Sequence, residues 1–306
     1  MSALPRKAIL AAATDRRTRA FMNRYGMRLG AARFVAGETL DDCLAVLADL
    51  NAKGLHANTT LLGEDVESRE ETASVVAEFR TVLDRIHERE LRANLAVKLT
   101  HLGLLIDEEL AYENVGTLVD HAAERGNFLR IDMEHSSVVD ATLRIYRRLR
   151  ESGRENVGCV LQAYLYRTPT DLEALLPLAP NLRLVKGAYL EPPDIAYPKK
   201  ADVDDAYRRL LERALQGGAY VAVATHDERL IDHTIRFTGQ HGIATDRFEL
   251  QMLYGVRPQL QRDLAARGFK VLVATPYGPE WYPYLMRRLA ERPANLLFLV
   301  RNLFAR

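Results

Sequence analysis

The chain contains 306 residues with a formal net charge of +1, and 48% of them are hydrophobic. This composition is ordinary for a globular protein with a large core, and the near-neutral charge argues against nucleic acid as the main partner, because a phosphate backbone demands a basic face. No apolar run approaches the roughly 20 residues of a membrane span, and the first residues lack the apolar length of a signal peptide. We therefore expect a cytoplasmic protein, and the two distant cysteines, Cys43 and Cys159, exclude a disulfide framework.

The beginning of the chain is predicted to be helical, and we treat residues 1–50 as an N-terminal helical segment. Residues 5–36 show the apolar spacing of helices. The next stretch, GETLDDCLAVLADLNAKG, predicts a helix that Thr39 caps, with Asp42 three residues later and Gly54 as the stop signal. The apolar stripe of this helix consists of Leu40, Cys43, Leu44, Leu47 and Leu50.

Eight short apolar runs follow, separated by longer amphipathic stretches. Strands that are buried on both faces and separated by helices form a parallel sheet, and eight such units predict a closed (β/α)8 barrel, of the TIM type, over residues 51–306. A doubly wound open α/β sheet is the alternative. The runs lie at residues 55–63, 93–100, 128–134, 158–165, 182–190, 219–226, 247–255 and 270–278.

Each run is apolar at its start and polar at its end. A parallel barrel places its active site at the carboxyl ends of its strands, so these polar side chains are predicted to meet at one mouth. Any one of them alone is better explained as a solvated loop residue or half of an ion pair; the prediction rests on their recurrence. They are Lys98, Asp132, Gln162, Lys186, Gly187, Ala188, Tyr189, Thr225, His226 and Gln251, and the last run leads into Pro276-Tyr277-Gly278.

Several common catalytic motifs are missing. There is no G-x-G-x-x-G after a strand and no G-x-x-x-x-G-K-[ST], so the sequence gives no support for a Rossmann or P-loop phosphate cradle. There is also no H-E-x-x-H, no C-x-x-C and no G-x-S-x-G. We therefore predict no metal site and no serine-type hydrolysis.

The late stretch EWYPYLMRRLAE places four polar side chains on one face of a predicted helix. Tyr284, Arg287, Arg288 and Glu291 stand at relative positions 0, 3, 4 and 7. The simpler interpretation is a solvated face with a weak Arg287–Glu291 ion pair. The functional interpretation is a clamp, because the planar forks of two arginines match a carboxylate and Glu291 could meet a substrate ammonium. The second interpretation describes recognition of an amino acid.

Six motifs occur in one order along the chain: VKLTHLGL (97–104), LRIDMEHS (129–136), LQAYLYRT (161–168), LRLVKGAYLE (182–191), VATHD (223–227) and YLMRRLAERPANL (284–296). Together they resemble the proline dehydrogenase family, in its short monofunctional bacterial type. The resemblance runs from about residue 40 to the C-terminus, and VKGAYLE and YLMRRLAER carry most of it.

The resemblance implies a fold, a cofactor and a reaction. The family folds as a distorted (β/α)8 barrel whose last helix lies over the mouth, which would bring Arg287 and Arg288 onto the substrate. It binds FAD without a Rossmann fold, oxidises L-proline to Δ1-pyrroline-5-carboxylate by hydride transfer to flavin N5, and passes the electrons to a membrane quinone. A second dehydrogenase domain has no room in 306 residues, so a separate pyrroline-5-carboxylate dehydrogenase would take the product. Membrane contact would be peripheral, at the inner face, with NLLFLVRNLF as a candidate surface.

The resemblance also implies roles for individual residues. Asp132, under the substrate, and Arg183, beside the flavin, are the expected catalytic residues. The expected substrate-binding residues, with the arginines on the carboxylate and the last residue at the amine, are Lys98, Tyr189, Ala274, Tyr284, Arg287, Arg288 and Glu291. The expected FAD-binding residues are Met133, Gln162, Arg183, Val185, Lys186, Gly187, Ala188, Thr225, His226 and Gln251.

One position departs from the family pattern. Relatives carry tyrosine two residues before the proline of PYG, where it packs against the substrate ring, but this chain has Ala274. Without the aromatic wall the pocket would be larger and proline would lose packing. We therefore expect trans-4-hydroxy-L-proline, or another substituted cyclic imino acid, to be handled at least comparably with proline.

Two other classes stay open at this point. A barrel aldolase or lyase could use Lys98 or Lys186 as a Schiff base, and would be colourless where a flavoprotein is yellow. A non-catalytic protein on the same scaffold could bind an imino acid or a flavin, and would show no turnover with an artificial electron acceptor.

Overall fold

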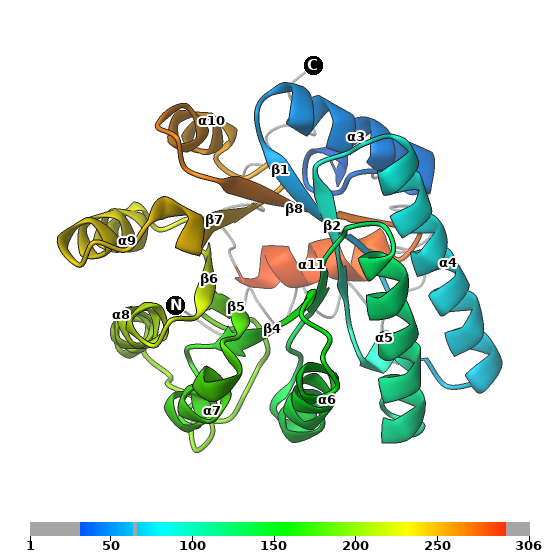
Figure 1. The fold of residues 1–306 in the computed structure, drawn as a ribbon, viewed down its shortest axis with the longest axis horizontal. Coiled ribbons are helices and arrows are strands. Elements are labelled where there is room, and N and C mark those ends of the chain that lie inside the picture. Colours follow the sequence, from blue (N-terminus) through cyan, green and yellow to red (C-terminus); the bar gives the residue numbers. More distant parts are fainter. Residues whose placement is uncertain (1–30, 64–65, 292–306) are drawn as a thin grey trace.

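Eight parallel strands form a closed barrel with helices around it (Figure 1). The structure is a computed structural model that describes residues 31–63 and 66–291, with side chains up to Met286. Each strand pairs with its neighbours in the chain, and the last strand closes the barrel on the first, from His56 opposite Leu272 to Leu61 opposite Tyr277. The closed barrel confirms the predicted fold class and rules out the open sheet.

Strands and helices alternate along the chain, and each predicted run coincides with one strand to within a few residues. The strands are β1 (His56–Leu61), β2 (Ala93–Val97), β3 (Leu129–Ile131), β4 (Val157–Gln162), β5 (Asn181–Val185), β6 (Tyr220–Ala224), β7 (Phe248–Leu253) and β8 (Val271–Tyr277). The helices are α3 (Leu40–Ala52), α4 (Arg69–Glu88), α5 (Glu108–Ala123), α6 (Val139–Glu151), α7 (Thr168–Leu175), α8 (Lys200–Gln216), α9 (Glu228–Gln240), α10 (Pro258–Ala266) and α11 (Trp281–Glu291). The helices expected within residues 5–30 lie outside the described residues, and the domain boundary at residue 50 stays a prediction.

Helix α3 begins at the capping box that the sequence predicts. The Thr39 hydroxyl accepts a hydrogen bond from the backbone N–H of Asp42, whose carboxylate accepts one from the backbone N–H of Thr39. This reciprocal pair satisfies two of the donors that a helix start leaves unpaired. After the helix, Gly54 has φ of +79°, which suits glycine. The apolar stripe of α3 packs against β1 and β8.

The interior of the barrel is polar. Side chains alternate between the two faces of a strand, so the strand register places Asn58, Arg130, Arg183 and Glu249 on the inner face. All four are at least 92% buried, and each has hydrogen bonds to its neighbours. Arg130, Arg183 and Glu249 stand within their strands, so the simple pattern of an apolar start and a polar end is wrong for β3, β5 and β7. Inside a closed barrel these charged groups can pair with one another, away from the apolar layer between strands and helices.

Helix α11 does not join the outer ring. Figure 1 shows it crossing the centre of the barrel view, over the strands, as predicted for the last helix. Its first residue, Trp281, is fully buried and donates from Nε1 to Glu38 Oε1 at 2.7 Å. Just before it, the backbone N–H of Gly278 donates to the carbonyl of Gly37 at 3.1 Å. These contacts fasten the start of α11 to the segment that precedes α3.

Candidate active site

Polar side chains that follow consecutive strands lie at one end of the barrel. Lys98 comes after β2, Asp132 after β3 and Gln162 at the end of β4. Lys186 comes after β5, and His226 follows β6. Because all eight strands are parallel, these positions share the mouth that α11 crosses in Figure 1.

Arg183 lies inside this mouth, with its guanidinium held by two side chains. Its Nη1 donates to Asp132 Oδ1 at 2.6 Å, and its Nη2 donates to Asn58 Oδ1 at 2.6 Å. The Arg183 side chain is 10% exposed and that of Asp132 is 26% exposed. Within the described part of the chain, Arg183 Nε is buried and has no hydrogen-bond partner. A buried donor without a partner points to an acceptor that a bound molecule would supply.

The segment from Lys186 to Tyr189 runs close to the end of β4. The Lys186 carbonyl accepts from the backbone N–H of Tyr164 at 2.9 Å. Gly187 has φ of +115°, and a Cβ there would lie 2.2 Å from the ring of Tyr164, so only glycine fits. Further along, the rings of Tyr189 and His135 meet edge to face with their centroids 6.1 Å apart.

Glu191 fastens the same loop to the segment after β3. Its carboxylate accepts from the backbone N–H of Ser136 at 2.7 Å and from the Ser136 hydroxyl at 2.6 Å. Hydrogen bonds to an ionised acceptor are the stronger ones. The contact therefore joins the loop that carries Tyr189 to the loop that carries Asp132.

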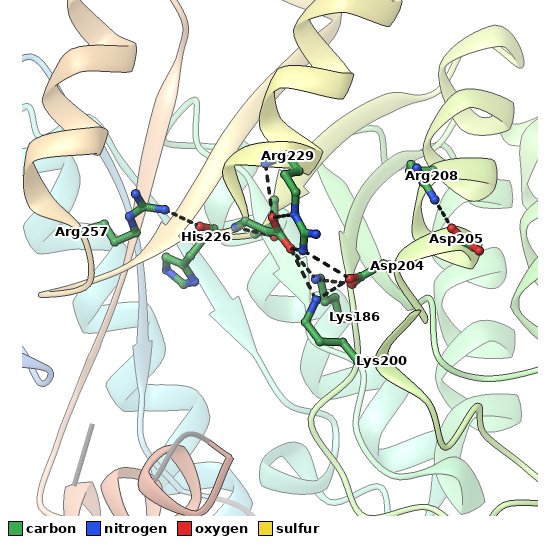
Figure 2. A network of polar contacts seen from close by, with 10 residues as sticks. Lys186, Lys200, Asp204, Asp205, Arg208, His226, Arg229 and Arg257 are labelled. Atoms are coloured by element: carbon green, nitrogen blue, oxygen red, sulfur yellow. Dashed lines mark hydrogen bonds and ion pairs between the residues drawn. The ribbon is translucent and has the colours of Figure 1, made fainter. Parts of the chain in front are cut away.

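Figure 2 shows an ion-pair network around Lys186. The Lys186 ammonium contacts Asp204, and it lies 3.3 Å from Asp227 Oδ2. Lys200 and Arg229 contact the same carboxylates and are much more exposed. The hydrogen bond from Arg229 contributes most to holding the pKa of Asp227 well below its usual range; burial acts against it, and the Lys186 charge adds to it. The Lys186 nitrogen is thus engaged by two carboxylates, whereas a Schiff-base lysine must present its nitrogen to a substrate carbonyl.

Two glutamine side chains in the barrel have fixed orientations. Gln162 Nε2 donates to the backbone carbonyl of Glu134 at 2.8 Å. Gln251 Nε2 donates to Glu249 Oε1 at 2.5 Å. Because both acceptors are oxygens that cannot donate, the two amide groups cannot be flipped without losing these bonds. Each glutamine therefore keeps its carbonyl oxygen for another donor.

The segment after β6 is fixed by its own polar contacts. Thr225 Oγ1 accepts from the backbone N–H of Asp227 at 3.1 Å. His226 Nε2 accepts from the backbone N–H of Leu253 at 2.9 Å, which places the hydrogen of the neutral imidazole on Nδ1. The His226 carbonyl accepts from Arg257 at 3.0 Å (Figure 2). The VATHD segment thus links β6 to β7 at the mouth.

The remaining expected site residues lie on β8, on α11 and beside the residues above. Ala274 stands opposite Asn58 in the sheet, so it faces the barrel interior, and it is partly exposed. Tyr284 is half-buried on α11. Met133 follows Asp132 in the chain and is buried. Val185 precedes Lys186, and Ala188 follows Gly187.

The expected carboxylate clamp lies at the end of α11. The helix continues unbroken from Trp281 to Glu291, so Tyr284, Arg287 and Arg288 stand on one continuous helix. The side chains after Met286 lie outside the described part of the structure. The clamp formed by the two arginines and Glu291 stays a prediction.

Four residues of the site were not indicated by the sequence patterns. Asn58 and Glu249 stand inside runs that form buried strands, and a polar residue in such a run is itself a signal of a buried polar contact. Asp204 lies on α8 among many other charged residues, and nothing distinguishes it there. Glu191 closes the motif LRLVKGAYLE, but its partner Ser136 lies 55 residues away.

Cysteine and metal chemistry have little basis in the described residues. Burial raises the pKa of the Cys43 thiol and of the Cys159 thiol to about 12 each, so neither is a thiolate at neutral pH. The described ranges contain no group of three or more histidine, cysteine or acidic residues that could hold a metal ion. A cavity of about 640 Å³ near His56 and Lys270 opens at the amino ends of the strands, the end that serves stability in such barrels.

The groups at the mouth suit a flavin dinucleotide. Arg183 offers its spare buried donor, and Lys186 offers an ammonium group for a pyrophosphate. The carbonyl oxygens of Gln162 and Gln251 can accept from the N–H of a flavin ring. At Gly187 the missing side chain makes room for the ring of Tyr164, which packs against the backbone next to Lys186. Arg183, Lys186, Gln162 and Gln251 would hold FAD.

Comparisons with known proteins place the chain in a family. The family model described as proline dehydrogenase matches residues 43–301. Proline dehydrogenase of Deinococcus radiodurans is 43% identical over 304 residues, which cover 98% of each chain. Proline dehydrogenase 1 of Bacillus subtilis (strain 168) is 42% identical over 283 residues, which cover 92% of this chain and 93% of that protein.

Solved structures agree on the fold. Proline utilization A (PutA) from Bdellovibrio bacteriovorus, inactivated by N-propargylglycine, matches with a TM-score of 0.78 at 24% identity, over 85% of this chain and 32% of that chain. PutA from Corynebacterium freiburgense matches with a TM-score of 0.75 at 23% identity, over 97% of this chain and 34% of that chain. The chain thus spans about a third of each of these proteins, and at this identity the likeness concerns the fold alone.

The closed parallel barrel and its polar mouth under a crossing helix define the class as a (β/α)8-barrel enzyme. With the family model covering most of the sequence and relatives above 40% identity over nearly the full length, the chain belongs to the proline dehydrogenase family, a family of oxidoreductases.

Proposed function

We propose that the protein oxidises L-proline to Δ1-pyrroline-5-carboxylate with FAD, and that a quinone takes the electrons. The observation that carries the proposal is the buried Arg183, which pairs with Asp132 and keeps a spare donor at the mouth. The names of the similar proteins support proline as the substrate. The ion pairs of Lys186 count against a Schiff-base lyase, and the names of the similar proteins, which denote enzymes, count against a non-catalytic protein that binds an imino acid or a flavin.

The mechanism follows from the charges around the substrate. Bound FAD supplies the two-electron oxidant. Proline loses a hydride from the ring carbon next to nitrogen while the nitrogen lone pair forms the C=N bond, so the nitrogen must first lose its extra proton. The charge of Lys98 favours that loss, and Asp132 helps to fix the amine. Arg183 stabilises the negative charge that moves toward the cofactor.

Binding of the substrate depends on two further elements. Arg287 and Arg288 would hold the carboxylate and fix the ring carbon in a reactive position, with Glu291 near the amine. On the other side, Tyr189 would close the pocket. The Glu191 contact with Ser136 keeps the loop of Tyr189 in place.

Changing Glu191 to glutamine should raise KM for proline about tenfold with little change in FAD affinity, because a neutral amide makes weaker hydrogen bonds to Ser136 than the carboxylate does. Steady-state kinetics with an artificial acceptor and titration of the flavin absorbance measure the two quantities. The milder variant Ser136→Ala removes only the hydroxyl and should raise KM less. An unchanged KM in Glu191→Gln would show that substrate binding does not depend on the contact between Glu191 and Ser136.

In this proposal, Ala274 determines whether the pocket accepts a substituted ring as well as proline. The similar proteins favour proline over the substituted ring that Ala274 led us to expect, so a substituted ring would be a second substrate at most. Changing Ala274 to tyrosine should raise the preference for proline over trans-4-hydroxy-L-proline, as a ratio of kcat/KM, by roughly tenfold, because an aromatic ring would fill space beside the substrate. Ala274→Val adds less volume and should change the ratio less. The same ratio in the native protein and in Ala274→Tyr would mean that this position does not line the substrate.

An anaerobic absorbance spectrum tests the proposed function directly. Purified protein should show flavin bands that bleach when L-proline is added. Bands that bleach only with trans-4-hydroxy-L-proline would move the substrate to substituted rings, and bands that neither compound bleaches would overturn the substrate. A folded protein that takes up no FAD would overturn the whole proposal.

The proposed electron acceptor and the proposed product each imply a partner. Reoxidation by a membrane quinone requires contact with a bilayer, which we propose to be peripheral, from a cytoplasmic location. None of the helices in residues 31–63 and 66–291 is long and apolar enough to cross a membrane. The segment NLLFLVRNLF, the candidate surface, lies outside the described residues. A separate pyrroline-5-carboxylate dehydrogenase would consume the product.

A further inference from the structure

We propose that Asn58 is a positioning residue, which anchors Arg183 through a neutral hydrogen bond and so leaves the charge of the guanidinium available to the flavin. The inference rests on the proposed function, because it assumes that Arg183 lies beside FAD. It assigns a role to strand β1, which contributes none of the site residues expected from the sequence.

The guanidinium of Arg183 is held from both sides. Asn58 Oδ1 accepts from Nη2 and Asp132 Oδ1 accepts from Nη1, each at 2.6 Å. Both anchors precede Arg183 in the chain, Asn58 by 125 residues on β1 and Asp132 by 51 residues after β3. With both Nη groups engaged, the planar fork cannot rotate without breaking one bond. Its Nε is a further donor, which is buried and has no partner among the described residues, so a ligand could accept from it.

The orientation of the Asn58 amide is itself determined. Asn58 Nδ2 donates to the Asn94 side-chain oxygen at 2.5 Å. A flipped amide would turn its N–H groups toward the donors of Arg183 and its oxygen toward the oxygen of Asn94, and both contacts would be lost. Asn58 is 3% exposed, so water cannot replace them easily. The chain of contacts from Asn94 through Asn58 to Arg183 therefore presents an oxygen, and only an oxygen, to the guanidinium.

Because Asn58 is neutral, it holds the guanidinium of Arg183 without cancelling its positive charge. Among the described residues, Arg183 has one carboxylate partner, Asp132, and its other side-chain partner, Asn58, carries no charge. The positive charge of Arg183 also acts on Arg130, which lies in the same barrel. Burial lowers the pKa of Arg130 most, the charge of Arg183 lowers it further, and the resulting pKa is about 10. A cation close to a cofactor that gains negative charge favours the reduced form. A carboxylate at position 58 would place a second negative charge on the guanidinium and weaken that effect.

The test is the midpoint potential of the bound flavin, measured by equilibration with a reference dye. In Asn58→Asp we expect the equilibrium to shift at least tenfold toward the oxidised flavin, which is about 30 mV for a two-electron couple. Asn114→Asp makes the same chemical change on helix α5, where the side chain donates to the Leu102 carbonyl at 3.0 Å, and should leave the potential unchanged. Asn58→Ser stays neutral but is too short to reach Arg183, so bleaching of the flavin by saturating proline should slow about tenfold.

The outcomes separate this inference from the function on which it rests. Native protein that binds no flavin overturns both. If proline bleaches the flavin of the native protein, but the flavin in Asn58→Asp keeps the native midpoint potential, only the role of Asn58 is overturned. If Asn58→Asp fails to fold or to hold FAD, the decision passes to Asn58→Ser, in which an unchanged rate of bleaching overturns the inference and a slower rate with unchanged FAD affinity supports it.

Discussion

Replacing Arg183 by lysine is expected to lower kcat/KM for proline by roughly a hundredfold while FAD stays bound. Lysine keeps the positive charge but has no fork, so its single ammonium cannot reach both Asp132 and Asn58, which lie on different sides of the guanidinium. Lysine also lacks the Nε donor of arginine, which would face the cofactor. Kinetics with an artificial electron acceptor, together with the flavin absorbance of the variant, measure both parts of this expectation.

The surface of the protein offers a matched control for this change. Arg213 makes a two-pronged contact with Glu173, with both nitrogen–oxygen distances at 2.6 Å, and both side chains are about half exposed. Arg213→Lys therefore repeats the loss of a fork away from the mouth and should leave kcat/KM unchanged. If Arg183→Lys were as active as the control, the fork of Arg183 would have no part in catalysis, and the proposed site would need another cation.

The barrel and its mouth could be predicted because they depend on local patterns. A buried strand gives a short apolar run, and the parallel arrangement then places every strand end at one mouth, so Lys98, Asp132, Lys186 and His226 could be grouped without any contact being known. The capping box of Thr39 and Asp42 is local in the same way, since its two residues are three positions apart. Such features need no knowledge of the rest of the fold.

The polar interior could not be predicted because it depends on pairs far apart in the chain. The bond from Arg183 to Asn58 joins residues 125 positions apart, and neither residue type marks the other in a sequence. Whether a polar residue within a strand faces the interior depends on the register of eight strands, and a shift of one residue would turn it to the opposite face. Glu249 illustrates the same point, since its partners come from three different strands or strand ends.

The family pattern and the physical patterns contributed different kinds of information. The motifs LRLVKGAYLE and YLMRRLAERPANL indicated the family, which the comparisons confirm. The roles of Arg287, Arg288 and Glu291 come from that resemblance, and spacing alone fits a solvated helix face equally well. The departure at Ala274 shows where a family pattern gives least guidance, because the substrate must then be decided by the shape of the pocket.

Removing the charge of Glu249 is expected to be the most destabilising single change discussed here. Glu249 is 2% exposed and accepts from Lys270 at 2.8 Å, from the Tyr220 hydroxyl at 2.9 Å and from Gln251 at 2.5 Å. Glu249→Gln removes the charged partner of Lys270 and a negative charge near the buried Arg130, and a hydrogen bond to a charged group contributes about 1.5–3 kcal/mol, so we expect a loss of this order. Urea unfolding at neutral pH measures the loss. The matched change Glu173→Gln, in the exposed pair with Arg213, should leave the unfolding midpoint almost unchanged.

The pH dependence of stability gives a second and sharper check on Glu249. Burial raises the pKa of this carboxyl, but Lys270, Arg130 and the hydrogen bond from Gln251 outweigh it, and the pKa lies below the ordinary value of 4.5. A carboxyl with a lowered pKa stabilises the folded state fully above its unfolded pKa, and that stabilisation is lost as the pH falls through the folded pKa. The difference in unfolding free energy between native protein and Glu249→Gln should therefore be largest at neutral pH and shrink as the pH falls below 4.5. A difference that stays constant from pH 7 into this acid range would mean that the charge of Glu249 does not stabilise the barrel, and that the variant acts through packing alone.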